Sequence, residues 1–348
     1  MIKMVPFLPR LIAWELTGAC NLKCVHCRAS ATKERDESEL STEEAKHLID
    51  DITKFADPIL ILSGGEPLLR EDVYEIAAYG TDKGMRVVLA TNGTLLTPEI
   101  AAKLKKAGVQ RISISLDGAS AKAHDDFRGT LGAFEGALRG INALKEAHLS
   151  FQINTTVTKR NMGEIPKILD LSLELGADAL HIFLFVPVGR GKAIEGDEIL
   201  PEEYERVLSW LCDMQGKVQL QLKATCAPHY FRIMHQRSRR AEKASGLSMM
   251  TRGCLAGTGF CFISKIGEVY PCGYLPVLAG SIREQSFEQI WHQSRVFKNL
   301  RDFNTLKGKC GICEFKRVCG GCRARAYAAT GDYMAEEPCC IYQPRNLL

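Results

Sequence analysis

Short apolar runs alternate with amphipathic stretches between residue 10 and about residue 222. The apolar runs are rich in Ile, Leu and Val, and they have the length of buried strands rather than of helices. They occupy residues 10–17, 58–63, 85–90, 110–116, 150–157 and 179–186. The amphipathic stretches have helical spacing and occupy residues 41–55, 70–83, 97–107, 131–147 and 161–175. This alternation predicts βαβ units and a parallel sheet.

The number of these units limits the shape of the sheet. Six strand candidates are too few for a closed eight-stranded barrel, so we expect an α/β fold built as an open, partial (β/α)6 TIM barrel. Ser41-Thr-Glu-Glu44 is a capping-box pattern and predicts the start of a helix. Parallel α/β folds bind ligands at the carboxyl ends of their strands. Functional residues are therefore expected directly after each strand.

Length and charge fit a soluble enzyme. The 348 residues suffice for a large domain and a smaller one, and the net charge of +4 is too small to indicate a nucleic-acid partner. No apolar run reaches the roughly 18 residues of a membrane span. Pro6, Pro9 and Arg10 interrupt the N-terminal segment before a signal peptide is possible. We therefore expect a cytoplasmic protein with no membrane span and no nucleic acid among its partners.

The fourteen cysteines change this picture. Without an export signal they are not expected to form disulfides. Three lie between residues 20 and 27 and nine lie between residues 254 and 340, whereas Cys212 and Cys226 stand apart and are interpreted as ordinary buried thiols. The clustering predicts metal sites at both ends of the chain. Oxygen damages exposed iron–sulfur clusters, so an anaerobic setting is expected.

The first cluster of cysteines has the spacing Cys20-x3-Cys24-x2-Cys27 and follows the first predicted strand. Three thiols on such a loop can hold three corners of one iron–sulfur cluster and leave one iron open for another ligand. Zinc is the alternative. A closed zinc site needs a fourth ligand, and His26 adjoins Cys27 too closely for both to reach one ion easily. The spacing therefore favours iron and sulfide.

With Gly64-Gly65-Glu66-Pro67 after the second strand, this motif resembles the radical S-adenosylmethionine (SAM) superfamily, and the resemblance extends over essentially the whole chain. The resemblance implies that Cys20, Cys24 and Cys27 hold three irons of a 4Fe–4S cluster. The fourth iron would chelate SAM, and reduction would give a 5′-deoxyadenosyl radical. One departure is His26, where the superfamily usually has an aromatic residue, although an imidazole can also stack.

The resemblance also assigns contacts to SAM. Gly64, Gly65, Glu66 and Pro67 would receive the amino group, since glycines allow a sharp turn and Glu66 and the backbone can accept hydrogen bonds. The remaining contacts follow the third to sixth strands and are Thr91, Asn92, Ser115, Asp117, Arg128, Asn154 and residues 185–191. Plain turns, a solvated loop arginine and core packing are the alternatives for these residues.

The C-terminal cysteines are Cys254, Cys261, Cys272, then Cys310-x2-Cys313-x5-Cys319-x2-Cys322, and finally Cys339-Cys340. Two zinc ribbons would explain the spacing alone. Beside a radical SAM domain, however, it resembles the SPASM extension, which carries auxiliary 4Fe–4S clusters. The resemblance assigns the nearer cluster to Cys254, Cys261, Cys272 and Cys322, and the farther one to Cys310, Cys313, Cys319 and either Cys339 or Cys340. The spacing before Cys322 is one residue shorter than usual, so one or two clusters remain possible.

We expect a radical SAM partial barrel at residues 1–222, a basic bridging segment at 223–250 and a SPASM domain at 251–348. The bridging segment includes a run of basic residues at 232–243. This run is interpreted either as a solvated helix face or as a patch that binds an anionic substrate.

Residues 9–17, 24–29, 319–328, 331–333 and 336–338 resemble the tetrapyrrole-modifying branch of the superfamily. This branch contains the AhbD-type haem synthases of the sirohaem-dependent route and the NirJ-like enzymes of haem d1 formation. The haem synthase is favoured, which implies oxidative decarboxylation of Fe-coproporphyrin III propionates to vinyl groups, giving haem b. The surplus electron would pass to an auxiliary cluster, and an external electron donor and acceptor are expected partners. Candidate propionate contacts, with surface solvation as the alternative, are Arg28, Lys33, Arg35, Arg323, Arg325 and residues 232–243.

Three alternatives stay open. One is NirJ-like removal of haem d1 side chains. Another is peptide or protein modification, as in a sulfatase-maturating oxidase, although the few residues before the first strand leave no room for a leader-binding domain. The third is a zinc-ribbon interaction protein without catalytic activity, for which the Gly64–Pro67 loop and Ser115-Leu-Asp117 would have no purpose.

Overall fold

One open sheet organises the molecule. The computed structural model describes residues 7–238 and 252–345. Its sheet has ten strands in the order β10-β9-β8-β1-β2-β3-β4-β5-β6-β7. The strands are β1 (Leu11–Glu15), β2 (Ile59–Ser63), β3 (Arg86–Thr91), β4 (Arg111–Ser115), β5 (Phe151–Val157), β6 (Ala179–Leu184), β7 (Gln221–Thr225), β8 (Phe260–Ile263), β9 (Glu268–Tyr270) and β10 (Gly280–Ser281). β1 to β7 run parallel to their neighbours, and so does β8 beside β1.

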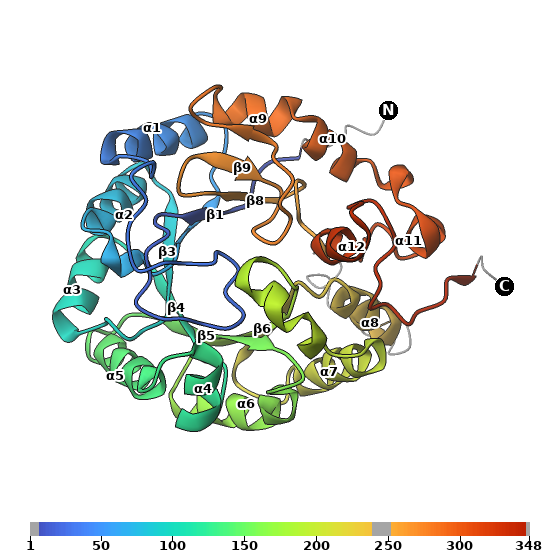
Figure 1. The fold of residues 1–348 in the computed structure, drawn as a ribbon, viewed down its shortest axis with the longest axis horizontal. Coiled ribbons are helices and arrows are strands. Elements are labelled where there is room, and N and C mark those ends of the chain that lie inside the picture. The colour runs from blue at the N-terminus through green and yellow to red at the C-terminus, as the bar shows by residue number, and fades with distance from the viewer. Residues whose placement is uncertain (1–6, 239–251, 346–348) are drawn as a thin grey trace.

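Helices cover the outside of the arc that the sheet forms (Figure 1). The α-helices are α1 (Thr42–Thr53), α2 (Val73–Asp82), α3 (Pro98–Lys106), α4 (Ala121–Arg128), α5 (Ala133–Glu146), α6 (Ile165–Glu174), α7 (Pro201–Met214), α8 (His229–Ser238), α9 (Phe287–Gln293), α10 (Arg295–Arg301), α11 (Gly308–Ile312) and α12 (Arg323–Thr330). Short 3-10 helices are η1 (Pro67–Leu69), η2 (Met162–Glu164), η3 (Gly189–Asp197) and η4 (Phe303–Thr305). The predicted parallel α/β partial barrel is confirmed.

The sheet is longer than the sequence pattern indicates. The six predicted strands correspond to β1–β6, and the predicted amphipathic stretches correspond to α1, α2, α3, α5 and α6. β7 escaped prediction because only Leu222 and Ala224 of its five residues are apolar and buried. β8 escaped prediction because it has four residues and lies within the cysteine-rich segment. Since β8 pairs with β1, the C-terminal segment continues the barrel sheet, and the division at residues 222 and 250 stays a prediction.

Local sequence accounts for the start of α1. The Glu44 backbone N–H donates to Ser41 Oγ at 3.2 Å, and the Ser41 N–H donates to Glu44 Oε2 at 2.8 Å. Both bonds satisfy helix N–H groups that have no partner within the helix. The predicted capping box is confirmed.

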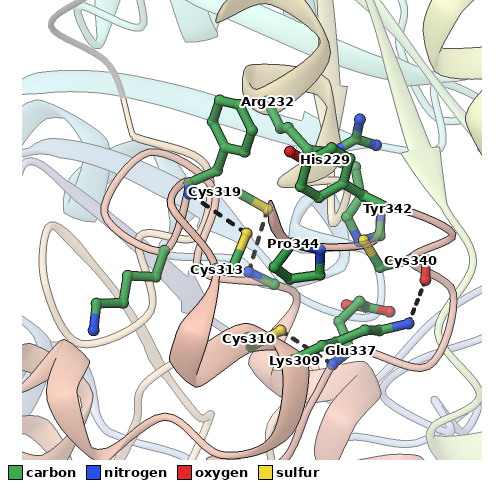
Figure 2. Close-up of a pocket in the computed structure, with 14 residues that line it drawn as sticks. His229, Arg232, Lys309, Cys310, Cys313, Cys319, Glu337, Cys340, Tyr342 and Pro344 are labelled. Atoms are coloured by element: carbon green, nitrogen blue, oxygen red, sulfur yellow. Dashed lines mark hydrogen bonds between the residues drawn. The ribbon is translucent and has the colours of Figure 1, made fainter. Parts of the chain in front are cut away.

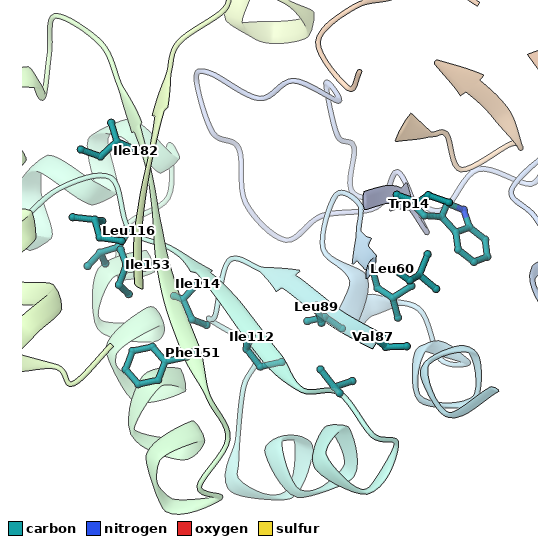
Figure 3. Packing of buried hydrophobic residues seen from close by; sticks show 14 of the residues in the cluster. Trp14, Leu60, Val87, Leu89, Ile112, Ile114, Leu116, Phe151, Ile153 and Ile182 are labelled. Atoms are coloured by element: carbon teal, nitrogen blue, oxygen red, sulfur yellow. The ribbon is translucent and has the colours of Figure 1, made fainter. Parts of the chain in front are cut away.

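Alternate strand residues separate an apolar outer face from a polar inner face. Trp14, Leu60, Leu89, Ile112 and Ile153 pack in the main core between the sheet and the helices (Figure 3). Successive side chains on a strand point to opposite faces, so the remaining positions face the interior of the arc. On β4 to β7 these inward-facing residues include Ser115, Asn154, His181 and Lys223, each of which pairs in register with the next across neighbouring strands.

The C-terminal segment, orange to red in Figure 1, runs from beside α1 round to α8. It therefore lies near both ends of the arc. Across the described ranges 7–238 and 252–345, no helix combines the length and apolar character that crossing a membrane requires.

We expect Leu60→Ala to lower the free energy of unfolding by about 2–5 kcal/mol, because it leaves a cavity in the core. Leu60 is fully buried, whereas Leu131 is 95% exposed and provides the matched control Leu131→Ala. The control should change the free energy by no more than about 0.5 kcal/mol. Urea titration of anaerobically prepared protein measures both, and equal effects would contradict the assignment of Leu60 to the core.

Candidate active site

The loop after β1 carries the first three cysteines over the opening of the arc (Figure 1). Cys20 and Cys24 are buried and Cys27 is partly exposed, and none forms a disulfide. Burial raises the pKa of Cys20 to about 11. Because metals bind the thiolate, a metal that binds here must displace a proton.

Backbone N–H groups of the same loop point at two of these sulfurs. Leu22 N–H lies 3.4 Å from Cys20 Sγ, and Ala31 N–H lies 3.5 Å from Cys27 Sγ. Hydrogen bonds to cysteine sulfur stabilise thiolate character and help to set the reduction potential of a bound cluster. The loop therefore suits three thiolate ligands.

The loop containing Gly65 holds the cysteine loop by direct backbone contact. Gly65 N–H donates to the Thr17 carbonyl and Glu66 N–H to the Ala19 carbonyl, each at 2.7 Å. A Cβ atom at Gly65 would lie 2.2 Å from the Ala19 oxygen. Only glycine allows the two backbones to approach this closely.

The Glu66 carboxylate joins the loops after β2 and β3. It is fully buried and accepts hydrogen bonds from Thr91 Oγ1 at 2.7 Å, Asn92 N at 2.9 Å and Leu68 N at 3.2 Å. Burial raises the pKa of Glu66, and these donors oppose the rise. Asn92 Nδ2 in turn donates to Asn21 Oδ1 at 2.8 Å, which connects β3 to the cysteine loop.

A buried ion pair lies beside Cys24. Arg128 Nη2 is 2.6 Å from Asp117 Oδ2, and Arg128 Nη1 is 3.6 Å from Cys24 Sγ. Burial alone would lower the pKa of Arg128, but Asp117 and Cys24 outweigh it, so the net shift is upward. Asp117 Oδ1 also accepts the Thr156 N–H at 2.7 Å. These contacts compensate the cost of burying both charges.

His26 stacks on Phe127, with ring centroids 4.3 Å apart and an angle of 27° between the rings. Burial holds the pKa of His26 well below its usual range, so the ring is neutral. Its Nε2 is 3.7 Å from Asp117 Oδ2, which is beyond hydrogen-bond distance. His26 thus makes the stacking contact that the superfamily usually makes with another aromatic residue.

Arg128 Nε and His26 Nδ1 are among the buried polar atoms around the first cysteines that have no hydrogen-bond partner. Buried donors and acceptors are normally paired, so this site fits a polar ligand. Ser115, the last residue of β4, is paired in register with Asn154 in the middle of β5, and both are half-buried. The structure thus places these two predicted contacts side by side on neighbouring strands.

Arg190, at the start of η3, lies within the predicted 185–191 segment, but sequence reasoning did not foresee its contacts with the cysteine loop. Its backbone N–H donates to the Cys27 carbonyl at 3.0 Å, and its guanidinium donates to the Cys24 and Ala31 carbonyls at 2.9 and 2.6 Å. At Gly189, with φ +56°, a Cβ would lie 2.1 Å from the Arg28 oxygen. The available signal was the Gly-Arg-Gly triplet shortly after β6.

Four C-terminal thiols line one opening (Figure 2). They are Cys310, Cys313, Cys319 and Cys340. The neighbouring Cys339 does not line this opening, and its Sγ instead donates to Glu198 Oε1 at 3.7 Å. The structure thus places Cys340, and not Cys339, with the cysteines of the predicted farther cluster.

The predicted nearer group is only partly assembled. Cys272 and Cys322 pack in one apolar cluster. Burial raises the pKa of Cys272 to about 12, and the adjacent Cys254 thiolate adds to this rise. Cys261 lies elsewhere, on β8, fully buried in the main core. The structure therefore does not bring Cys261 together with the other three.

Two family models match this chain. The radical SAM superfamily model matches residues 14–172, and a model of the SPASM iron–sulfur cluster-binding domain matches residues 254–323. A Methanosarcina barkeri protein named AdoMet-dependent heme synthase (AdoMet is SAM) is 62% identical over 97% of this chain and 97% of its own. The chain belongs to the radical SAM superfamily, in the AdoMet-dependent heme synthase family.

Other comparisons agree with this membership. A protein of the same name from Nitratidesulfovibrio vulgaris is 52% identical over 97% of this chain and 94% of its own. The crystal structure of Streptococcus suis SuiB bound to precursor peptide SuiA is 17% identical, with a TM-score of 0.78, and covers 97% of this chain and 76% of that one. SuiB therefore shares the fold.

Membership in this radical SAM family shows which cofactors the protein binds. The two matched domains bind 4Fe–4S clusters and SAM, which confirms the cofactor prediction. Within residues 7–238 and 252–345, no three His, Cys, Asp or Glu side chains converge on a point where one metal ion would be held. A single zinc ion needs all its sulfur ligands at about 2.3 Å.

Most arginines proposed to bind propionates already have other partners. Arg325 pairs with Glu198 at 2.7 Å, and Arg323 donates to the Tyr333 and Ala335 carbonyls. The structure therefore assigns Arg323 and Arg325 to internal contacts, which corrects that interpretation. Further pairs are Arg28 with Glu15, Arg35 with Glu39 and Arg232 with Glu205. Lys33 is exposed, and residues 239–243 lie outside the described residues.

We expect Gly65→Ala to reduce 5′-deoxyadenosine formation by about 100-fold, because the new methyl group displaces the cysteine loop by an ångström or more. Gly163→Ala is the matched control, since a Cβ there meets no atom within 4 Å. Product formation is measured by chromatography after anaerobic reconstitution and reduction with SAM. Wild-type turnover by Gly65→Ala would contradict the proposed backbone contact.

Proposed function

We propose that this radical SAM enzyme is a haem synthase, which converts two propionate side chains of Fe-coproporphyrin III to vinyl groups and so gives haem b. The observation that carries the proposal is the 62% identity to the Methanosarcina barkeri enzyme over 97% of both chains. That span includes both cysteine-rich regions. Similarity across both cysteine-rich regions indicates that the two proteins share the C-terminal iron–sulfur domain as well as the barrel.

The chemistry requires hydrogen removal and disposal of one electron. When bound, the first cluster supplies the electron that cleaves SAM. Each propionate loses one hydrogen atom from its β-carbon to the 5′-deoxyadenosyl radical. It then loses carbon dioxide and one electron and becomes a vinyl group. An external donor supplies the first electron, and an external acceptor receives the last.

Different residues around the first cysteines bind the cluster and the amino group of SAM. Cys20, Cys24 and Cys27 hold the cluster, and the loop from Gly64 to Pro67 receives the amino group. The Glu66 oxygens accept three hydrogen bonds, which leaves one of about four acceptor positions on a carboxylate. Glu66 therefore acts chiefly by fixing the loops, and the carbonyl groups of its loop are the remaining acceptors for an ammonium.

The SAM carboxylate is assigned to Arg128, whose Nε is buried without a partner. Asp117 holds this guanidinium in place through the 2.6 Å contact. Ser115 and Asn154, level with each other on β4 and β5, are assigned to the ribose.

The farther auxiliary cluster is assigned to Cys310, Cys313, Cys319 and Cys340, because all four line one opening. Cys254, Cys272 and Cys322 are assigned to the nearer one. Four thiolates leave no open iron, so such a cluster suits electron transfer. When bound, these clusters supply an acceptor for the electron released with carbon dioxide.

The polar inner face of the arc suits a substrate with carboxylates. Gln152 Nε2 donates to Asn154 Oδ1 at 2.9 Å and lies 3.0 Å from His181 Nδ1, which extends a polar row across β5 and β6. Lys223 continues this row on β7. It is exposed to solvent, yet desolvation by the surrounding protein and the nearby Arg10 lower its pKa. Both properties are expected of a cation on a concave wall, where a propionate can bind.

We expect the reconstituted enzyme to convert Fe-coproporphyrin III to haem b under anaerobic conditions with SAM and a reductant. Mass spectrometry should show the loss of one carbon dioxide and two hydrogen atoms per propionate, with about one 5′-deoxyadenosine for each. A Soret shift on titration would separate porphyrin binding from the peptide-modifying alternative. Unaltered porphyrin beside accumulating 5′-deoxyadenosine would contradict the proposal.

We expect Lys223→Gln to weaken Fe-coproporphyrin III binding about tenfold, the usual effect of losing one charged hydrogen bond. Lys223→Arg should bind nearly as well as the wild type. Binding should also weaken as the pH rises through the lowered pKa of Lys223, because the ammonium loses its charge there.

The matched control is Lys122→Gln, which removes an exposed lysine on α4 that pairs with Asp126. Soret titration gives the dissociation constant of each variant. Equal constants for Lys223→Gln and Lys122→Gln would exclude Lys223 from the substrate site.

A further inference from the structure

The cysteines that the structure brings together for the predicted nearer auxiliary cluster are one thiol short of a full set of ligands. Cys272 and Cys322 pack in one apolar cluster, and Cys254 is close enough to raise the pKa of both. A 4Fe–4S cluster held only by cysteines, however, needs four thiolates. The resemblance supplied Cys261 as the fourth. Its side chain packs in the main core on β8, and Arg301 is the charged group that affects its pKa, with no contribution from another cysteine.

A different thiol lies beside all three. Cys226 packs against the apolar cluster that contains Cys272 and Cys322. Burial raises the pKa of Cys226 well above its usual range, and the Cys322, Cys272 and Cys254 thiolates add to this rise. Cys226 therefore has the three neighbours that Cys261 lacks.

The position of Cys226 in the fold supports a role in binding. It directly follows β7, at the carboxyl end of the last parallel strand, where ligands bind in folds of this kind. Its backbone is left-handed, with φ +56°. That conformation is unfavourable for a residue with a side chain, and glycine would adopt it without strain.

Two buried side chains hold this backbone in place. Tyr204 Oη donates to the Cys226 carbonyl at 2.8 Å, and Arg325 Nη1 donates to it at 3.2 Å. Arg325 also pairs with Glu198 and Glu337. Strained backbone persists where the surroundings fix it, and it concentrates at functional sites.

We propose that Cys226, and not Cys261, completes the thiolate ligands of the nearer auxiliary cluster together with Cys254, Cys272 and Cys322. The bridging segment then supplies a ligand, so this cluster fastens the end of β7 to the C-terminal domain. Its four irons are all bound by protein, which excludes direct coordination of the substrate. The ligand assignment does not depend on the identity of the porphyrin.

Cys226→Gly tests this without disturbing the fold, because glycine tolerates the left-handed backbone. Cys261→Ala is the matched control, since it also removes one buried thiol. Both variants are reconstituted anaerobically, and iron, sulfide and the electron paramagnetic resonance spectrum of the reduced protein are measured. 5′-Deoxyadenosine formation without porphyrin reports separately on the first cluster.

We expect Cys226→Gly to lose about four irons per chain, or to show a three-iron signal, while the first cluster still cleaves SAM. Cys261→Ala should retain the iron content and spectrum of the wild type. The proposal is overturned if Cys226→Gly retains the wild-type iron and spectrum. These readouts need no substrate, so failure of the haem synthase proposal would leave them unchanged.

Discussion

The structure depends on how the irregular loop from Cys20 to Cys27 satisfies its own backbone. Buried peptide groups need hydrogen-bond partners, and the loops after successive strands provide them. Glu66 N–H bonds the Ala19 carbonyl, Phe127 O accepts the Val25 N–H, and Arg190 bonds the Cys24 and Ala31 carbonyls. The three thiols are therefore positioned by the carboxyl edge of the whole sheet. A ligand that contacts several of these loops meets a surface that is already fixed.

A buried ion pair also lies next to the thiols that hold the first cluster. Asp117 holds Arg128, and Arg128 reaches Cys24 Sγ. Hydrogen bonds and charge near the sulfurs are means by which proteins tune cluster potentials. From this edge the polar inner face extends across β5 and β6 to Lys223 on β7, and Cys226 directly follows Thr225, the last residue of β7. The proposed substrate surface thus lies between the first cysteines and the nearer auxiliary group.

Sequence periodicity was sufficient for the parallel strands β1–β6 and for the start of α1, because strong apolar alternation and a capping box act locally. It missed β7 and β8, whose few apolar residues become strand-like only when neighbouring strands pair with them. The motifs likewise located the first three cysteines and the Gly65 loop. The spacing of the C-terminal cysteines could not show which thiol belongs to which cluster. Cys261 and Cys226 differ in their place in the fold, because Cys261 lies within β8 and Cys226 follows the end of β7. The bonds from Arg190 to the cysteine loop were not predicted, because its carbonyl partners are more than 150 residues away in the chain.

The most direct measurement is an iron anomalous difference map from crystals of the reconstituted protein with SAM and Fe-coproporphyrin III. We predict one cluster peak at Cys20, Cys24 and Cys27, and two more at the C-terminal thiol groups that include Cys226 and Cys340. The porphyrin iron should give a separate peak inside the arc, on the side of Lys223. A porphyrin iron on the outer surface, or a cluster peak at Cys261, would contradict this arrangement.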